Sequence, residues 1–77
     1  MGAAVRTAFA SWEREIAQAA ENNGMSAKNA AMFASAMLTA MEGAFVVSKA
    51  QASSTAHNNA SHATRALANA LLSASQN

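Results

Sequence analysis

The hydrophobic pattern is densest in the middle of the chain, from Met25 to Gln51. This stretch is long enough for about seven helical turns, contains no proline, and has Gly43 as its single glycine. Its polar residues fall at helical spacings and form one narrow stripe: Lys28, Ser35, Thr39, Glu42 and Lys49. A helix that is apolar in almost every other direction must be covered on more than one side. We therefore expect residues 26–51 to form a helix that contacts several neighbours.

Residues 3–21 show the three- and four-residue spacing that is typical of an amphipathic helix. The apolar side of this helix consists of Val5, Phe9, Trp12, Ile16 and Ala19 or Ala20. The run Asn22-Asn23-Gly24 predicts its end, because glycine or asparagine can take the left-handed conformation that closes a helix. Ser26 is then the expected N-cap of the central helix, since its hydroxyl can accept a backbone N–H.

A third helix is predicted over residues 55–75, after a polar break at residues 51–55. Its apolar positions are Ala56, Ala60, Ala63, Leu67, Ala70, Leu71 and Ala74, and its polar positions are Asn58, His62, Arg65, Asn69 and Gln76. No segment has the alternating pattern of a strand. The sequence thus predicts one all-α domain over residues 1–77, with three antiparallel helices joined by short connections.

The hydrophobic core available to this chain is small. Hydrophobic residues make up 52% of the 77 positions, but 23 of them are alanine. Small domains bury a low fraction of their surface and are correspondingly marginal. We therefore expect an identical copy, a further domain, or both to supply additional buried surface.

The charge and the cysteine content of the chain exclude several classes of function. The net charge is +1, and the five basic residues are scattered, so this chain alone has no patch that would follow a phosphate backbone. The absence of cysteine excludes disulfides, thiolate metal sites and a cysteine nucleophile. The absence of cysteine also fits a cytoplasmic protein, and the first residues lack the basic start and apolar block of a signal peptide. Residues 30–47 approach the length of a membrane span, but Glu42 near their centre favours a buried helix of a soluble protein over a membrane helix.

The titratable residues do not form a catalytic or metal-binding pattern. His57 and His62 are five residues apart, whereas zinc-binding pairs on a helix favour a spacing of four. Glu13 and Glu15 point about 200° apart on a helix, so they do not form a carboxylate pair. The serines have no neighbouring base. We therefore predict no enzyme activity, no cofactor and no metal.

Three features of the sequence leave alternatives open. The spacing of Ala36, Ala40 and Gly43 or Ala44 suits close helix packing, although alanine is abundant everywhere. The carboxylate of Glu42 belongs either to a helix contact or ligand site, or to the solvated polar stripe. A third group either lines an adaptable apolar pocket or forms an ordinary core: Phe9, Trp12, Met32, Phe33, Met37 and Met41.

The order of these motifs resembles the C-terminal end of TetR-family transcriptional regulators. A helix with Phe9-x-x-Trp12 is followed by the stop at Gly24, an apolar helix, and a last helix with Leu67-x-x-x-Leu71-Leu72. In one branch of that family the penultimate helix reads ALEGAlllaRa, and residues 40–50 here read AMEGAFVVSKA. At residues 49–55, proline and arginine are common in the family but absent from this part of the chain. This difference affects the expected start of the last helix.

The resemblance implies a homodimer in which helices 26–51 and 55–75 form a four-helix bundle with those of a second copy. The implied dimer interface consists of Ala36, Ala40, Gly43, Ala44, Val47, Leu67 and Leu71. The resemblance also implies a pocket for a small hydrophobic effector, with one wall formed by Phe9, Trp12, Met32 and Phe33. DNA would be bound only through an N-terminal helix-turn-helix domain, which this chain lacks, so the chain resembles a fragment of such a regulator.

The leading hypothesis is therefore the dimerisation and effector-binding part of a TetR-type repressor. The alternative is a stand-alone helical interaction or structural module that self-associates. A protein that lies on a membrane surface would need a more basic polar face than these helices have.

Overall fold

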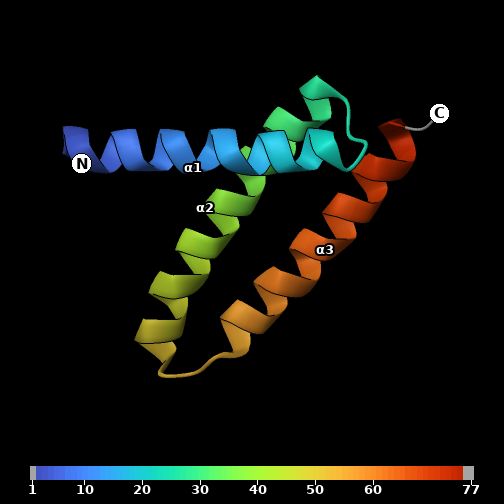
Figure 1. The fold of residues 1–77 in the computed structure, drawn as a ribbon. Coiled ribbons are helices and arrows are strands. Elements are labelled where there is room, and N and C mark those ends of the chain that lie inside the picture. Colours follow the sequence, from blue (N-terminus) through green and yellow to red (C-terminus); the bar gives the residue numbers. More distant parts are fainter. Residues whose placement is uncertain (1, 76–77) are drawn as a thin grey trace.

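The computed structural model describes residues 2–75, and these form three α-helices (Figure 1). The helices are α1 (Ala3–Asn22), α2 (Ala27–Gln51) and α3 (Thr55–Ser75). Residues 2–75 contain no strand. The all-helical, three-helix prediction is therefore confirmed for the part of the chain that the structure describes.

The turn between α1 and α2 is built by local side-chain and backbone contacts. Gly24 has a φ of 108°, so it takes the left-handed role that the sequence predicts after α1. The Oγ of Ser26 accepts a hydrogen bond from the backbone N–H of Asn29 at 3.2 Å, which confirms Ser26 as an N-cap. Met25 and Ala30, on either side of this cap, are both buried, as in a hydrophobic staple. These contacts fix the direction in which the chain enters α2.

The end of α2 is closed without glycine. Ala52 takes the left-handed conformation with a φ of 50°, and the N–H of Ser53 donates to the carbonyl of Ser48 at 3.1 Å. A left-handed alanine costs about 1–2 kcal/mol. The Oγ of Ser53 then accepts the N–H of Thr55 at 3.2 Å, at the first residue of α3. This closure explains why the polar break between the two helices needs neither proline nor glycine.

Figure 1 shows α2 and α3 side by side and antiparallel, whereas α1 crosses α2 obliquely. The predicted antiparallel order therefore applies to α2 and α3 and not to α1. The buried core lies where the C-terminal halves of α1 and α3 meet the first half of α2. It consists of Ala20, Met25, Ala30, Phe33 and Leu71.

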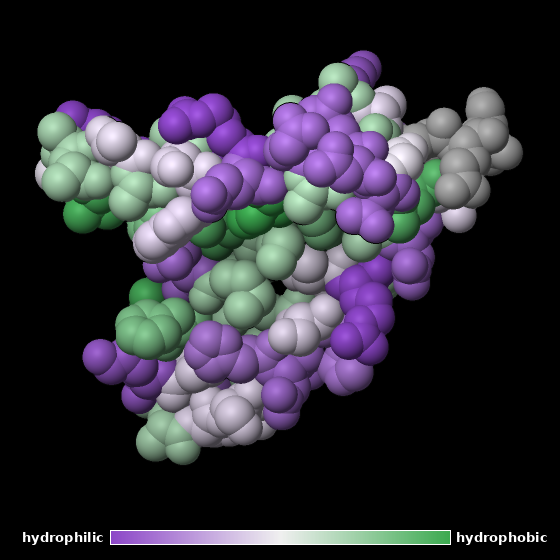
Figure 2. All heavy atoms as spheres, in the orientation of Figure 1, coloured by the Kyte–Doolittle hydropathy of each residue, from purple (hydrophilic) through white to green (hydrophobic). Residues whose placement is uncertain are grey.

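Most of α2 remains outside this core. The helices form a flat arrangement with extents of 41 × 30 × 13 Å. Only Ala30, Phe33, Ala34 and Ala44 are buried in α2. In the view of Figure 2, apolar side chains lie open to solvent beneath α1. A single chain thus leaves much of its apolar surface exposed.

The composition of α2 would also suit a membrane helix. An 18-residue window in it has a mean hydropathy of 1.6, and 17% of that window is buried. Length and composition alone would let such a helix cross a bilayer, but one such helix is weak evidence because core helices of soluble proteins have the same properties. The low buried fraction means that most of α2 is open to solvent in the single chain.

Candidate functional site

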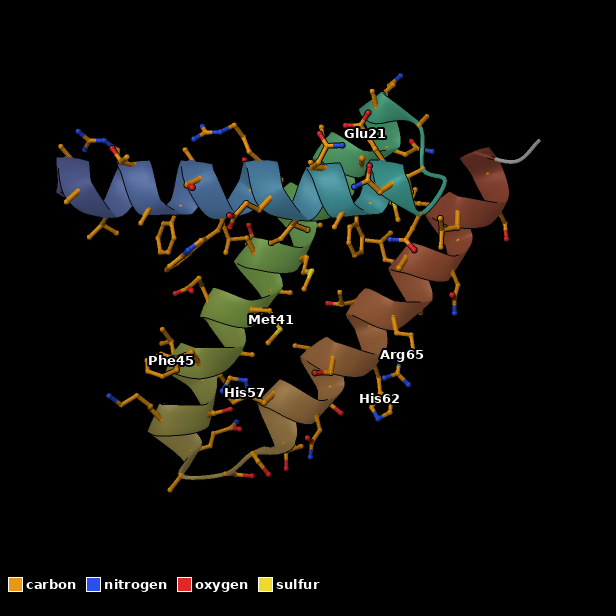
Figure 3. All side chains as sticks on the ribbon, in the orientation of Figure 1. Glu21, Met41, Phe45, His57, His62 and Arg65 are labelled. Atoms are coloured by element: carbon orange, nitrogen blue, oxygen red, sulfur yellow. The ribbon has the colours of Figure 1, made fainter. Side chains whose placement is uncertain are left out.

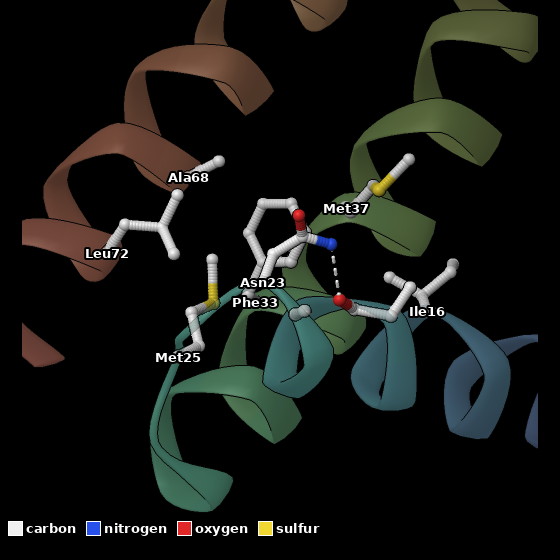
Figure 4. Close-up of a pocket in the computed structure, with 9 residues that line it drawn as sticks. Ile16, Asn23, Met25, Phe33, Met37, Ala68 and Leu72 are labelled. Carbon is white, nitrogen blue, oxygen red and sulfur yellow. Dashed lines mark hydrogen bonds between the residues drawn. The ribbon is translucent and has the colours of Figure 1, made fainter.

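The first candidate site is a hollow between α1, the first half of α2 and the C-terminal half of α3, which we call the apolar pocket (Figure 4). Its volume is about 420 Å³, which is within the range of pockets that bind small molecules. Its walls are formed by Ile16, Ala19, Ala20, Asn23, Met25, Phe33, Met37, Ala68 and Leu72. It is therefore an open extension of the core rather than a closed cavity inside it.

Asn23 is the polar residue in this wall. Its Nδ2 donates to the carbonyl oxygen of Ala19 at 2.8 Å, because both residues lie in the last turn and cap of α1. This bond holds the side chain against α1 at the edge of the pocket (Figure 4). The rest of the wall is hydrocarbon and thioether, so the pocket suits an apolar ligand with at most a few polar groups.

The second candidate site is a hollow between the N-terminal half of α1 and the middle of α2, which we call the α1–α2 groove. Its volume is about 490 Å³, and its walls are formed by Phe9, Glu13, Leu38, Thr39, Glu42, Gly43 and Val46. The ring of Phe9 lies 5.4 Å from the ring of Trp12, centre to centre, at a tilt of 54°. The groove therefore combines apolar side chains, the aromatic ring of Phe9 and two carboxylates.

The predicted pocket wall is divided between these two hollows. Phe33 lines the apolar pocket, and Phe9 lines the α1–α2 groove. Trp12 and Met32 are 47% and 53% exposed and line neither of them. Met25, Asn23 and Leu72 belong to the apolar pocket but were absent from the predicted wall. The position of Met25 directly before the N-cap was the one sequence signal for its burial.

The predicted interface residues also fall into two groups. Ala44 and Leu71 are buried within the single chain, and Leu67 is half-buried against the core. The others are exposed or half-buried on α2, and on a helical wheel they lie within about 60° of one another. We call this second group the free face of α2; it consists of Ala36, Ala40, Gly43 and Val47.

A third group of side chains lies near the connection between α2 and α3. The Nζ of Lys49 is 5.3 Å from the ring centre of Phe45, and the ring of His57 is 6.5 Å from it. His62 and Arg65 point away from this cluster (Figure 3). Within residues 2–75 no group of three His, Cys, Asp or Glu side chains could hold a metal ion. This cluster packs the end of the hairpin and offers no catalytic arrangement.

Comparison with known proteins gives one match. The family model described as the C-terminal domain of LmrA/YxaF-like transcriptional regulators, a TetR-type domain, matches residues 1–63. The match covers α1, α2 and the first part of α3, including the Glu42-Gly43-Ala44 motif. No curated protein and no solved structure gave a significant match.

Proposed function

The chain belongs to the family of C-terminal domains of LmrA/YxaF-like transcriptional regulators, and from this premise we propose that it is the dimerisation and effector-binding part of a TetR-type repressor. Regulators of this family are soluble transcription factors rather than enzymes, and their C-terminal domains generally dimerise and bind effectors. We assign the chain to the cytoplasm for the same reason. The match to a regulator family favours this function over a stand-alone structural module.

The proposal is based mainly on the exposure of the free face of α2. Its members Ala36, Ala40 and Val47 line neither the apolar pocket nor the α1–α2 groove, whereas Gly43 lies at the edge of that groove. Since α1 covers one side of α2 and α3 packs beside it, the free face stays open in one chain. It contains no charged residue, so a second copy could cover it without burying a charge.

Exposed small residues also occur on α3. Ala63, Ala70 and Ala74 are exposed, and on a helical wheel they lie within about 40° of one another. Small side chains on both helices allow another helix pair to approach closely. A second α2–α3 hairpin of identical sequence presents a complementary small-residue surface, as a symmetric dimer requires.

The exposed area of the chain supports the same conclusion. The accessible surface is 5129 Å², whereas a globular monomer of this mass exposes about 4,400 Å². The excess of about 700 Å² is close to the roughly 800 Å² that each partner buries in a standard interface. One chain therefore exposes an excess of surface about equal to the area that one partner buries in a standard interface.

We assign the effector to the apolar pocket. Phe33 and Met37 of α2 line this pocket, and Ala36 and Ala40 of the same helix lie on its free face. A ligand that favours one position of α2 therefore also favours one arrangement of the two copies. In the whole regulator this population shift would change the spacing of the two DNA-binding domains. DNA contact would come only from those N-terminal domains.

Filling the apolar pocket tests the effector assignment. Ala19 lies at the rim of the pocket and is exposed, so Ala19→Phe would place a ring in the hollow without disturbing the core. We expect the neutral dye N-phenyl-1-naphthylamine to bind the unsubstituted chain saturably, with enhanced fluorescence. We expect Ala19→Phe to weaken that binding by about tenfold or more, the effect of losing a ligand's apolar contact area.

The matched control is Ala10→Phe, which adds the same ring to an exposed position of α1 outside both hollows. This variant is expected to bind the dye as the unsubstituted chain does. Equal binding by all three proteins would show that the dye occupies another surface and would count against the effector assignment.

A further inference from the structure

Asn23 and Gly24 form the one asparagine–glycine step in the chain, and they lie in the turn between α1 and α2. Asparagine is a thermally labile residue. A glycine after it offers the least steric hindrance to the close approach of its backbone nitrogen. We propose that Asn23 is a site of spontaneous deamidation, and that the opening of this turn controls the rate of the reaction. The inference depends neither on dimerisation nor on effector binding.

The reaction consumes only water and involves no change of oxidation state. The backbone nitrogen of Gly24 loses its proton to solvent and attacks the Cγ of Asn23, which forms a cyclic imide. The Cγ–Nδ2 bond breaks, and Nδ2 takes a proton from solvent and leaves as ammonia. Water then cleaves one of the imide C–N bonds. Cleavage at Cγ gives aspartate, and cleavage at the main-chain carbonyl carbon gives isoaspartate, in which the backbone runs through Cβ.

The closed turn holds both reacting groups in hydrogen bonds. The Nδ2 of Asn23 donates to the carbonyl oxygen of Ala19 at 2.8 Å (Figure 4), and the N–H of Gly24 donates to the carbonyl oxygen of Glu21 at 3.0 Å. The first bond fixes the side chain against α1. The second occupies the proton that the attacking nitrogen must lose, so attack costs this bond as well. We therefore assign the reaction to an open form of the turn.

Asn23 differs from the other asparagines in its surroundings. Among the asparagines that the structure describes, it is the one outside a helix, and it is exposed to the water that the reaction needs. Asn22 ends α1 and is followed by a residue with a side chain, which hinders attack. The remaining described asparagines precede residues whose N–H groups belong to a helix: Asn29, Asn58, Asn59 and Asn69. We therefore expect Asn23 to react first.

The products would weaken the turn that they form in. Aspartate has no Nδ2 donor, so its carboxylate would face the carbonyl oxygen of Ala19 at the C-terminus of α1, where a negative charge is unfavourable. Isoaspartate lengthens the backbone directly before Gly24. This change displaces the N–H of Met25, which donates to the carbonyl oxygen of Ala20 at 3.1 Å and anchors a core residue. Both products also place a carboxylate in the wall of the apolar pocket.

The first test measures deamidation by peptide mass mapping of the full chain, kept in mildly alkaline buffer with and without guanidinium chloride. In the denaturant we expect Asn23 to convert faster than every other asparagine. In native buffer, with helicity verified by circular dichroism, its conversion should be at least about tenfold slower, because only the open fraction reacts. Equal rates in a helical and an unfolded chain would overturn the control by the turn. Equal conversion of all asparagines in denaturant would overturn the site.

A capping variant tests whether this turn sets the rate. The Oγ of Ser26 caps α2 directly after the turn, by accepting the N–H of Asn29. We expect Ser26→Ala to speed the conversion of Asn23 in native buffer by about fivefold, the effect of losing an N-cap. The matched control is Ser53→Ala, which removes the hydroxyl that accepts the N–H of Thr55 in the other connection. The control should leave the rate unchanged.

An unchanged rate in Ser26→Ala, or an equal acceleration in Ser53→Ala, would overturn the assignment of the reaction to an opening of this turn. In guanidinium chloride both variants should convert at the rate of the unsubstituted chain, because the turn is open in all three.

A second pair of variants tests the effect of the product. Asn23→Asp removes the Nδ2 donor, whereas Asn22→Asp adds the same charge at the same helix end but keeps its bond, because the Oδ1 of Asn22 accepts the Nε2 of Gln18 at 3.0 Å. We expect the unfolding equilibrium constant of Asn23→Asp to be about fivefold larger than that of Asn22→Asp in urea titrations. Equal stability of the two variants would overturn the claim that conversion weakens the turn.

Discussion

Replacing Ala36 with glutamate is expected to separate the proposed dimer and to lower its melting temperature. Ala36 is exposed in the single chain and lies on the free face of α2, beside Ala40. In a symmetric dimer the substitution would bury an unpaired carboxylate from each copy. An unpaired buried charge costs several kcal/mol, so association should weaken by at least about a hundredfold. Thermal unfolding followed by circular dichroism at equal protein concentrations measures the effect.

Ser35→Glu is the matched control for this substitution. Ser35 is the neighbouring residue and is also exposed, but it belongs to the polar stripe rather than to the free face. Glutamate there stays in water, so the melting temperature should change little. Equal melting of the two variants and the unsubstituted chain would contradict the assignment of the free face to an interface.

Phe33→Ala is expected to destabilise the fold more than any other single truncation. Phe33 is 8% exposed, belongs to the core cluster and lines the apolar pocket. Truncation of a buried phenylalanine costs about 3–5 kcal/mol, because the transfer energy is lost and a cavity remains. Native proteins have a total stability of about 5–15 kcal/mol, and a domain as small as this one lies at the low end of that range. The variant should therefore be partly or wholly unfolded at 25 °C by circular dichroism.

Phe45→Ala makes the same chemical change on the same helix and serves as its control. Phe45 is 52% exposed, and its ring contacts are the Lys49 ammonium and the His57 ring. We expect a loss of about 1 kcal/mol, the size of an exposed cation–π or aromatic contact. A loss as large as that of Phe33→Ala would mean that the second half of α2 carries core packing of its own.

The parts of the fold that depend on local sequence could be predicted. The left-handed Gly24 and the Ser26 cap act within a few residues, and the structure confirms both. Helix formation itself follows from periodicity and the high helix propensity of alanine. The family was predictable for the same reason, because the Glu42-Gly43-Ala44 motif and the helix order can be read along the chain.

The division of residues between core, pocket and free face could not be predicted in the same way. Because α2 is apolar nearly all round, its periodicity does not tell which side meets α3 and which side stays open. Ala44 and Leu71 therefore had the same sequence signal as Ala36, yet only the first two are buried within the chain. The separation of Phe9 from Phe33 follows from the oblique crossing of α1, which depends on the Met25 staple and the core.

Sedimentation equilibrium of the unsubstituted chain over a wide concentration range tests the central claim most directly. If the free face of α2 joins two copies, the mass should approach twice the 7.9 kDa of one chain as concentration rises. Helical content should increase with it, because burial at the interface stabilises the fold. A helical, cooperatively unfolding protein that stays at 7.9 kDa at every concentration would contradict the account.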